Sequence, residues 1–142
     1  MQAQNLKNHS RLVTGYHYVT FSLLLLVLIG SIVNLVHSAS ENVYSASLLL
    51  VLTIATILVA FYARVFALKA QDRGIRAEEN FRHFITTGKQ LDNRLKMAQI
   101  IALRFAGDDE FVVLAKRAAE ENLSAKDIKA AIQNWKGDYH RA

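Results

Sequence analysis

The histidines are the side chains in this sequence best suited to acid–base or metal chemistry, and their spacing supports neither. They are His9, His17, His37, His83 and His140. No two are three or four residues apart, so no helical turn would present a pair of imidazoles to one metal ion. The sequence also contains no HExxH or Glu-x-x-His pattern. A proton relay or haem ligand could be imagined at His17 and His37, which flank an apolar segment, but an interfacial side chain is the simpler interpretation.

A run of three acidic residues, Asp108, Asp109 and Glu110, is the other cluster that could bind a ligand. Adjacent carboxylates suit a hard cation, but they equally suit the first turn of a helix, where free N–H groups favour negative charge. The glycines are scattered and form no phosphate-binding loop, Gly-x-Ser-x-Gly does not occur, and cysteine is absent. We therefore expect a non-enzymatic protein with no catalytic residue, no metal site and no cofactor.

Two apolar segments, 16–36 and 44–63, are the dominant feature of the 142-residue sequence. Neither contains Asp, Glu, Lys or Arg, and each approaches the ~20 helical residues that cross a bilayer core. Only residues 37–43 separate them. Proline is absent throughout, which favours long uninterrupted helices. The pattern predicts an all-α fold, in which a transmembrane helical hairpin of two spans is followed by a small cytoplasmic helical domain.

The predicted organisation has six parts. They are a cytoplasmic N-terminal segment 1–15, a first transmembrane helix 16–36, an external loop 37–43, a second transmembrane helix 44–66, a basic juxtamembrane helix 67–87 and a cytoplasmic helical tail 88–142. A cleaved signal peptide is the alternative for the first span, because Lys7 and Arg11 precede it and small residues follow it. The length of the segment and the second apolar run directly after it favour an uncleaved span.

The distribution of positive charge predicts how the hairpin is threaded. Cations flank the cytoplasmic ends at Lys7 and Arg11 before the first span and at Arg64, Lys69, Arg73 and Arg76 after the second. The loop 37–43 has neither Lys nor Arg. Positive residues near span ends stay in the cytoplasm, so both termini are expected there. The chain carries a net charge of +5, and its excess lies next to the membrane, which indicates anionic lipid headgroups as partners and argues against nucleic acid.

Small and polar residues line one face of each span and could mediate helix packing. They are Gly30 and Asn34 in the first span and Thr56, Ala60, Ala63 and Ala67 in the second. Either these faces close the hairpin on itself, or they bind another membrane protein or a second copy of the chain.

The segment after the second span is expected to continue as one helix toward Thr86. Its apolar residues Ala77, Phe81, Phe84 and Ile85 recur on one face. One interpretation places this helix on anionic headgroups, with Arg64, Lys69, Arg73, Arg76 and Arg82 as the contacts. The other packs its apolar stripe against the helices that follow.

The tail sequence predicts three short helices after a break at Thr86-Thr87-Gly88. The first has a stripe of Leu91, Leu95, Ala98, Ala102 and Phe105 and stops at Gly107. The second begins at Asp108-Asp109 and has Phe111, Leu114, Ala115 and Ala118 on one face. The third has Ser124 as N-cap, Asp127 in the capping-box position and a staple of Leu123 with Ile128; Ala131, Ile132 and Trp135 continue its stripe to Gly137.

Three stretches resemble a family of small bacterial two-span membrane proteins catalogued as a domain of unknown function, DUF6526. They are LKNHSRLVTGYHYV at the first span, LKAQDRGIRAEENFR after the second, and the C-terminal stretch from QIIALRFAGDDEF to AAIQNWKGDYHR. The resemblance covers most of the chain and implies a bacterial cytoplasmic (inner) membrane location. It implies no activity, so no site residue can be transferred.

The preferred hypothesis is therefore an accessory or scaffolding subunit, which binds another membrane protein or forms a homo-oligomer. One rival is a small channel or transporter assembled from several hairpins, although the polar residues of the spans share no evident face. The other rival is a lipid-sensing signalling module, whose basic helix would exchange between membrane and tail.

Overall fold

The computed structural model describes residues 4–6, 8 and 12–139, and every regular element in them is helical. The chain divides into two units. The hairpin unit is Leu12–Ala67, and the tail unit combines the described residues of Met1–Arg11 with those of Leu68–Ala142. Lys7, His9, Arg11 and His140 lie outside the described residues.

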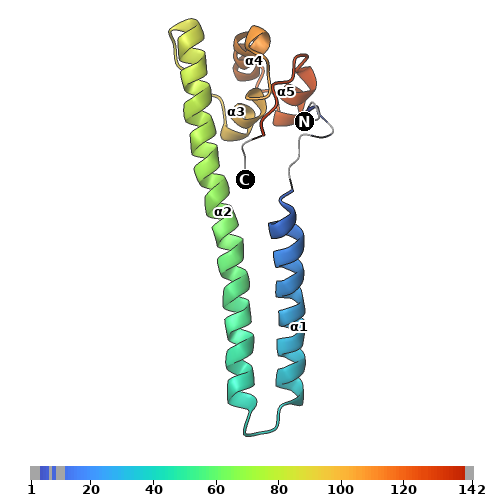
Figure 1. The fold of residues 1–142 in the computed structure, drawn as a ribbon. Helices are drawn as coiled ribbons and strands as arrows, with labels where there is room; N and C mark the ends of the chain where they lie inside the picture. Colours follow the sequence, from blue (N-terminus) through green and yellow to red (C-terminus); the bar gives the residue numbers. More distant parts are fainter. Residues whose placement is uncertain (1–3, 7, 9–11, 140–142) are drawn as a thin grey trace. The chain divides into compact units, whose positions relative to one another are not determined.

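The hairpin unit contains the two apolar segments as helices joined by a short loop (Figure 1). The first begins with a π-helical turn, η1, at Gly15–Thr20, in which the Thr20 hydroxyl donates to the carbonyl of Gly15 over 3.2 Å. It continues as α1, Phe21–His37, and α2 follows at Val43–Thr87. Both helices are long and apolar enough to cross a membrane.

Few side chains of the hairpin unit are buried, and one tyrosine of η1 bonds to α2. Ser31, Ala46 and Thr53 are the buried residues of this unit, and the Tyr16 hydroxyl donates to the carbonyl of Ala60 over 2.5 Å. The guanidinium of Arg64 lies 6.0 Å from the centre of the Tyr16 ring. Most of the leucines, valines and isoleucines on both helices are exposed.

The helix α2 runs without a break for 45 residues and ends at Thr87. Gly88 follows with a φ of +70°, a left-handed conformation that ends helices and that glycine adopts at little cost. The predicted continuation of the second apolar helix, and its break at Thr86-Thr87-Gly88, are thus both confirmed.

Three short helices complete the tail unit: α3 at Met97–Leu103, α4 at Asp108–Glu120 and α5 at Ala125–Ala131 (Figure 1). Their apolar faces and Ile75 of α2 form one core, whose largest fully buried side chains are Phe105, Phe111, Ile100, Leu103 and Ile128. The predicted face of α4 is confirmed, since Phe111, Leu114, Ala115 and Ala118 are all buried. So is the cap of α5, where the Ser124 hydroxyl accepts from the N–H of Asp127.

The boundaries of the first and third tail helices differ from the prediction. Leu91 and Leu95 are buried but precede α3, in an irregular segment that ends where Lys96 caps the helix. At the C-terminus α5 ends after Ala131, because Ile132 takes an extended conformation. Ile132 and Trp135 therefore lie beyond the helix. Gly107 stops no helix; it is the N-cap of α4.

Candidate functional site on the helical tail

Two sequence stretches meet at the centre of the tail unit: the turn 103–110 between α3 and α4, and the extended segment 132–138 after α5. Ala106 and Trp135 form an isolated antiparallel bridge. The N–H of Gly107 donates to the carbonyl of Asn134, and that of Lys136 to the carbonyl of Phe105, each over 2.8 Å. The backbones thus pair as a short piece of sheet, which explains why the chain leaves the helical conformation at Ile132.

This pairing depends on the absence of a side chain at Gly107. A Cβ there would stand 2.5 Å from Oδ1 of Asp109 and 3.1 Å from both Cβ and the carbonyl oxygen of Asn134. The Asp109 carboxylate can swing away from such a Cβ, but Asn134 would have to move by a few tenths of an ångström, so glycine fits this close approach best. The Phe105 and Trp135 rings, with centres 5.3 Å apart, pack beside the bridge.

The acidic triplet 108–110 stabilises the pairing between the 103–110 turn and the 132–138 segment, which we call the junction. Glu110 accepts hydrogen bonds from the N–H groups of Gln133 and Asn134, both at 3.0 Å, and Asp109 accepts from the side-chain amide of Asn134 at 2.6 Å. Asp108 accepts from Nε of Arg82 at 2.7 Å. Each of the three carboxylates therefore has a protein donor. Among the described residues, no group of three or more His, Cys, Asp or Glu side chains is arranged to hold a metal ion.

Arg82 of α2 is the side chain that connects the long helix to the junction. Besides Asp108, its guanidinium donates to Glu79 over 3.1 Å and to the carbonyl of Ala106 over 2.7 Å. It also lies over the ring of Phe111, with Cζ 4.1 Å from the ring centre. Only 13% of the side chain is exposed. The planar fork of arginine can satisfy these partners together, which a single ammonium could not.

The charges around Arg82 are in unequal environments. Burial raises the pKa of Glu79 above its usual value, although the hydrogen bond and the charge of Arg82 oppose the shift. Asp108 is largely exposed, and the hydrogen bond from Arg82 lowers its pKa. The buried carboxyl is therefore the weaker acid of the two.

A small polar cleft of about 200 Å³ lies beside this network. It is lined by Ile75, Glu78 and Glu79 of α2, by Arg104, and by the segment from Lys136 to Tyr139. Arg104 is nearly buried and pairs with Asp138 over 2.9 Å. The residues that line this cleft include no serine, cysteine or histidine, and its charged side chains are Glu78, Glu79, Arg104, Lys136 and Asp138.

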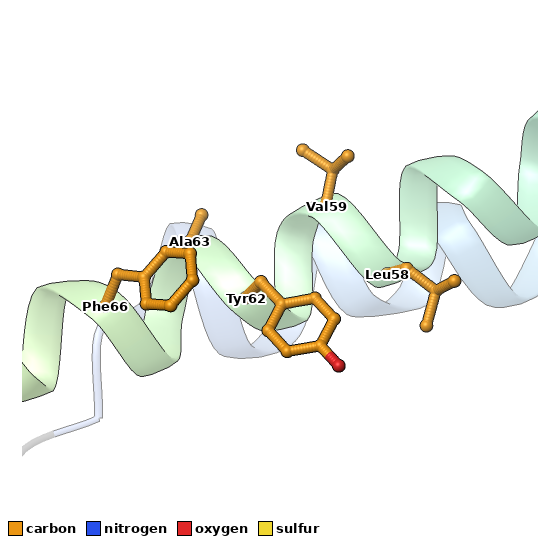
Figure 2. A pocket seen from close by; sticks show the side chains of 5 residues that line it. All are labelled: Leu58, Val59, Tyr62, Ala63 and Phe66. Carbon is orange, nitrogen blue, oxygen red and sulfur yellow. The ribbon is translucent and has the colours of Figure 1, made fainter.

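The hairpin unit offers a groove of a different kind (Figure 2). Leu58, Val59, Tyr62, Ala63 and Phe66 line it, all from one helix, and almost all of its surface is apolar. Figure 2 shows these side chains projecting from successive turns of α2. Such a surface suits an acyl chain or an apolar helix rather than a polar substrate.

The structure separates the five basic residues that we predicted to contact lipid headgroups. Lys69, Arg73 and Arg76 are exposed on α2 and Arg64 is half-buried, whereas Arg82 is enclosed in the tail. The other interpretation of this helix is that its apolar stripe packs against the helices that follow. It does not hold for Phe81, Phe84 and Ile85, which remain exposed.

The residues predicted to mediate packing of the spans are mostly exposed in this chain. Nothing lies within 4 Å of a Cβ built at Gly30. Asn34, Thr56, Ala63 and Ala67 are exposed, and only Ala60 is half-buried. The buried residues of the hairpin unit are Ser31, Ala46 and Thr53.

Each described histidine is held locally through Nδ1. His17 lies 3.1 Å from the carbonyl of Val13, His37 lies 2.9 Å from that of Val33, and His83 lies 2.7 Å from that of Lys89. The three are bound to their own neighbourhoods and form no common centre.

Sequence reasoning missed two residues that organise the tail. Arg82 was assigned to the lipid-facing set, although its spacing of three and seven residues from Glu79 and Ile75 places all three on one helical face. The other is Gln99, only 4% exposed, whose amide accepts from the N–H of Lys96 at 2.7 Å and donates to the carbonyl of Leu123 at 2.8 Å. A glutamine three residues after a helix start is the signal that could have indicated it.

The chain belongs to a family described as a family of unknown function (DUF6526), which it matches over residues 1–142. The match extends over both units, including the two stretches that meet at the Ala106–Trp135 bridge. No curated protein and no solved structure gives a significant match.

Proposed function

We propose that this protein is a non-enzymatic integral membrane protein of the bacterial cytoplasmic membrane, where it acts as an accessory or scaffolding subunit. Two spans form its anchor, and the helical tail is presented at the cytoplasmic face. The observation that carries the proposal is the exposure of the apolar helices. Only 6% and 11% of their most apolar stretches are buried within the chain.

Exposure on this scale supports a membrane anchor over the usual alternative for apolar helices, which is the core of a water-soluble domain. A buried core helix hides most of its apolar surface, because each exposed Leu, Ile or Phe side chain forgoes roughly 1.5–3 kcal/mol of burial. Contiguous apolar faces along both helices would make a soluble chain aggregate. Lipid is the solvent that fits them.

The charges support one orientation for the proposed anchor. The loop between the helices carries Glu41 as its only formal charge, whereas Arg64, Lys69, Arg73 and Arg76 follow the second helix closely. This asymmetry favours a cytoplasmic tail and an external loop.

The tail supports a binding role more than a catalytic one. Arg82 and Glu110 hold α2, the 103–110 turn and the C-terminal segment together. That arrangement fixes a small rigid domain to the end of a long helix, which suits presentation to another protein.

Affinity purification of the tagged chain from bacterial membranes in mild detergent, followed by native mass spectrometry, tests this role. We expect a complex that contains at least one other protein in fixed stoichiometry. A ring made only of copies of this chain would contradict the accessory role and favour the channel. Recovery in the soluble fraction, with no detergent required, would contradict the membrane anchor itself.

A further inference from the structure

The exposed face of α2 within the tail unit is apolar and has no partner among the described residues. Phe81, Phe84 and Ile85 are 66%, 52% and 67% exposed, although they belong to a helix whose opposite face is buried with Ile75 and Glu79. Three large apolar side chains together on the face that turns away from a well-formed core indicate a surface that another molecule covers.

This face follows a seven-residue repeat. Ala70, Gly74, Ala77, Phe81 and Phe84 are spaced four, three, four and three residues apart, as the two core positions of a coiled coil are. All five are exposed. A strict repeat of seven drifts by ~20° per heptad on a straight helix, so it remains on one line only when two helices wind around each other.

We propose that this face binds the same face of a second copy of the chain, as a parallel two-helix coiled coil. The contact would place Phe81 and Phe84 against their counterparts. The small residues Ala70, Gly74 and Ala77 do not define the contact, but they allow the two backbones to approach closely. Nothing lies within 4 Å of a Cβ built at Gly74.

Charge complementarity indicates that the binding partner is a second copy of the chain and that the two helices run parallel. In this register Arg73 directly precedes the core residue Gly74, at heptad position g. Glu78 directly follows the core residue Ala77, at position e, five residues after Arg73. In a parallel pair these two positions meet across the interface, and they set partner choice and orientation. Arg73 of each copy would therefore meet Glu78 of the other, twice by symmetry. Both residues are exposed, and neither forms an ion pair within the described part of the chain.

The same charges argue against a lipid surface as the occupant. A helix that lies on anionic headgroups is basic along both borders of its apolar face. Here Arg73 borders one side, but Glu78 borders the other, where headgroups would repel it. An arrangement with opposite charges on opposite borders is complementary to itself.

The proposal rests on the membrane anchor of the proposed function in one respect. Two copies inserted in the same orientation have their α2 helices pointing the same way, so parallel pairing is the only geometry open to them. Confinement to a membrane also raises the effective concentration of the second copy.

Disulfide trapping in native membranes tests the contact. Because the chain contains no cysteine, each variant carries a single thiol. Ala77→Cys and Ala70→Cys place a thiol in the core of the proposed interface, whereas Arg76→Cys, at the exposed position next to Ala77, places it on the outside. After mild oxidation we expect at least about fivefold more covalent dimer for the first two variants, because a disulfide requires Cα atoms within ~7 Å. Equal trapping of Arg76→Cys would overturn the contact.

A charge exchange tests the register independently. Arg73→Glu and Glu78→Arg, each in the Ala77→Cys background, should lower the trapped fraction severalfold, because like charges then face each other. Combining both should restore trapping, and Arg76→Glu should leave it unchanged. A double variant no better than the single ones would overturn the proposal.

The two proposals fail separately. If the chain is in the membrane fraction but Ala77→Cys and Ala70→Cys give no dimer, the pairing is wrong and the anchor stands. If the chain is soluble, the anchor is wrong, while trapping of Ala77→Cys over Arg76→Cys would still support the pairing.

Discussion

The guanidinium of Arg82 lies over the ring of Phe111, with Cζ 4.1 Å from the ring centre. The contact joins α2 to α4 through a cation and an aromatic face, which attract each other most strongly where water is excluded. Because the same guanidinium also binds Glu79, Asp108 and the carbonyl of Ala106, the tail should depend on this one residue.

Arg82→Gln should therefore destabilise the tail strongly. The change removes the cation between two carboxylates and leaves Glu79 buried without its ion pair, a loss of about 3 kcal/mol for a buried pair. The single tryptophan, Trp135, packs against Phe105 in the tail and reports its unfolding by fluorescence in detergent. Arg76→Gln on the exposed face is the matched control and should change the free energy of unfolding by less than ~0.5 kcal/mol. Equal effects of the two variants would rule out the role given to Arg82.

Gly107→Ala should weaken the junction between the 103–110 turn and the C-terminal segment. The new methyl group would meet Asp109 and Asn134 at distances that force them apart, at a cost of about 1–3 kcal/mol. Gly30→Ala adds the same methyl group where nothing lies within 4 Å, and it should leave the Trp135 transition unchanged. An unaltered transition in the Gly107 variant would show that the close approach is not required.

Gln99→Leu should destabilise the packing of α3 against the segment after α4. Leucine preserves the volume but leaves the N–H of Lys96 and the carbonyl of Leu123 without the partners that Gln99 provides. Both hydrogen bonds are partly buried, so the loss of each should cost about 0.5–1.5 kcal/mol. Gln133→Leu, at an exposed side chain, is the comparison, and chemical denaturation of both variants measures the difference. Similar midpoints would contradict the role of the amide.

The stability of the tail should depend on pH through Glu79. Because burial raises its pKa above the usual 4.5, the folded chain holds this proton more tightly than the unfolded chain does. The resulting stabilisation is complete below pH 4.5 and is lost as the pH rises through the folded-state pKa. The free energy of unfolding of the wild type should therefore fall relative to that of Glu79→Gln over this window.

The same titration separates Glu79 from Asp108. The pKa of Asp108 is lowered by Arg82, so its stabilisation is present above pH 3.8 and is lost as the pH falls through the lower folded-state value. Its exposure makes that contribution small. Unfolding of the wild type and Glu79→Gln, followed at Trp135 from about pH 4 to 8, measures the effect. A constant difference between the two chains would contradict the burial of Glu79.

The features that the sequence predicted correctly are those that neighbouring residues determine. The end of α2 depends on Gly88, and the start of α5 depends on Ser124 and Asp127, all within one helical turn. The face of α4 follows from the spacing of Phe111, Leu114 and Ala118. In each case local conformational preference and packing agree.

The errors arise where distant residues decide the conformation. Ile132 and Trp135 continue the helical spacing of α5, but pairing with Phe105 and Ala106, far away in sequence, pulls this segment into an extended conformation. Leu91 and Leu95 have helical spacing because both are buried, although the backbone between them turns. The partners of Arg82 lie up to 29 residues away at Phe111, beyond the reach of any local pattern.

Accessibility of single cysteines from the two sides of the membrane tests the two-span anchor and the cytoplasmic position of the tail. Ser40→Cys lies in the loop between the helices, and Lys126→Cys lies on α5; both positions are exposed. We expect a membrane-impermeant maleimide to label Ser40→Cys in intact bacterial cells and to label Lys126→Cys only after the membrane is opened. Labelling of Lys126→Cys from outside, or of neither position until lysis, would contradict a two-span anchor with a cytoplasmic tail.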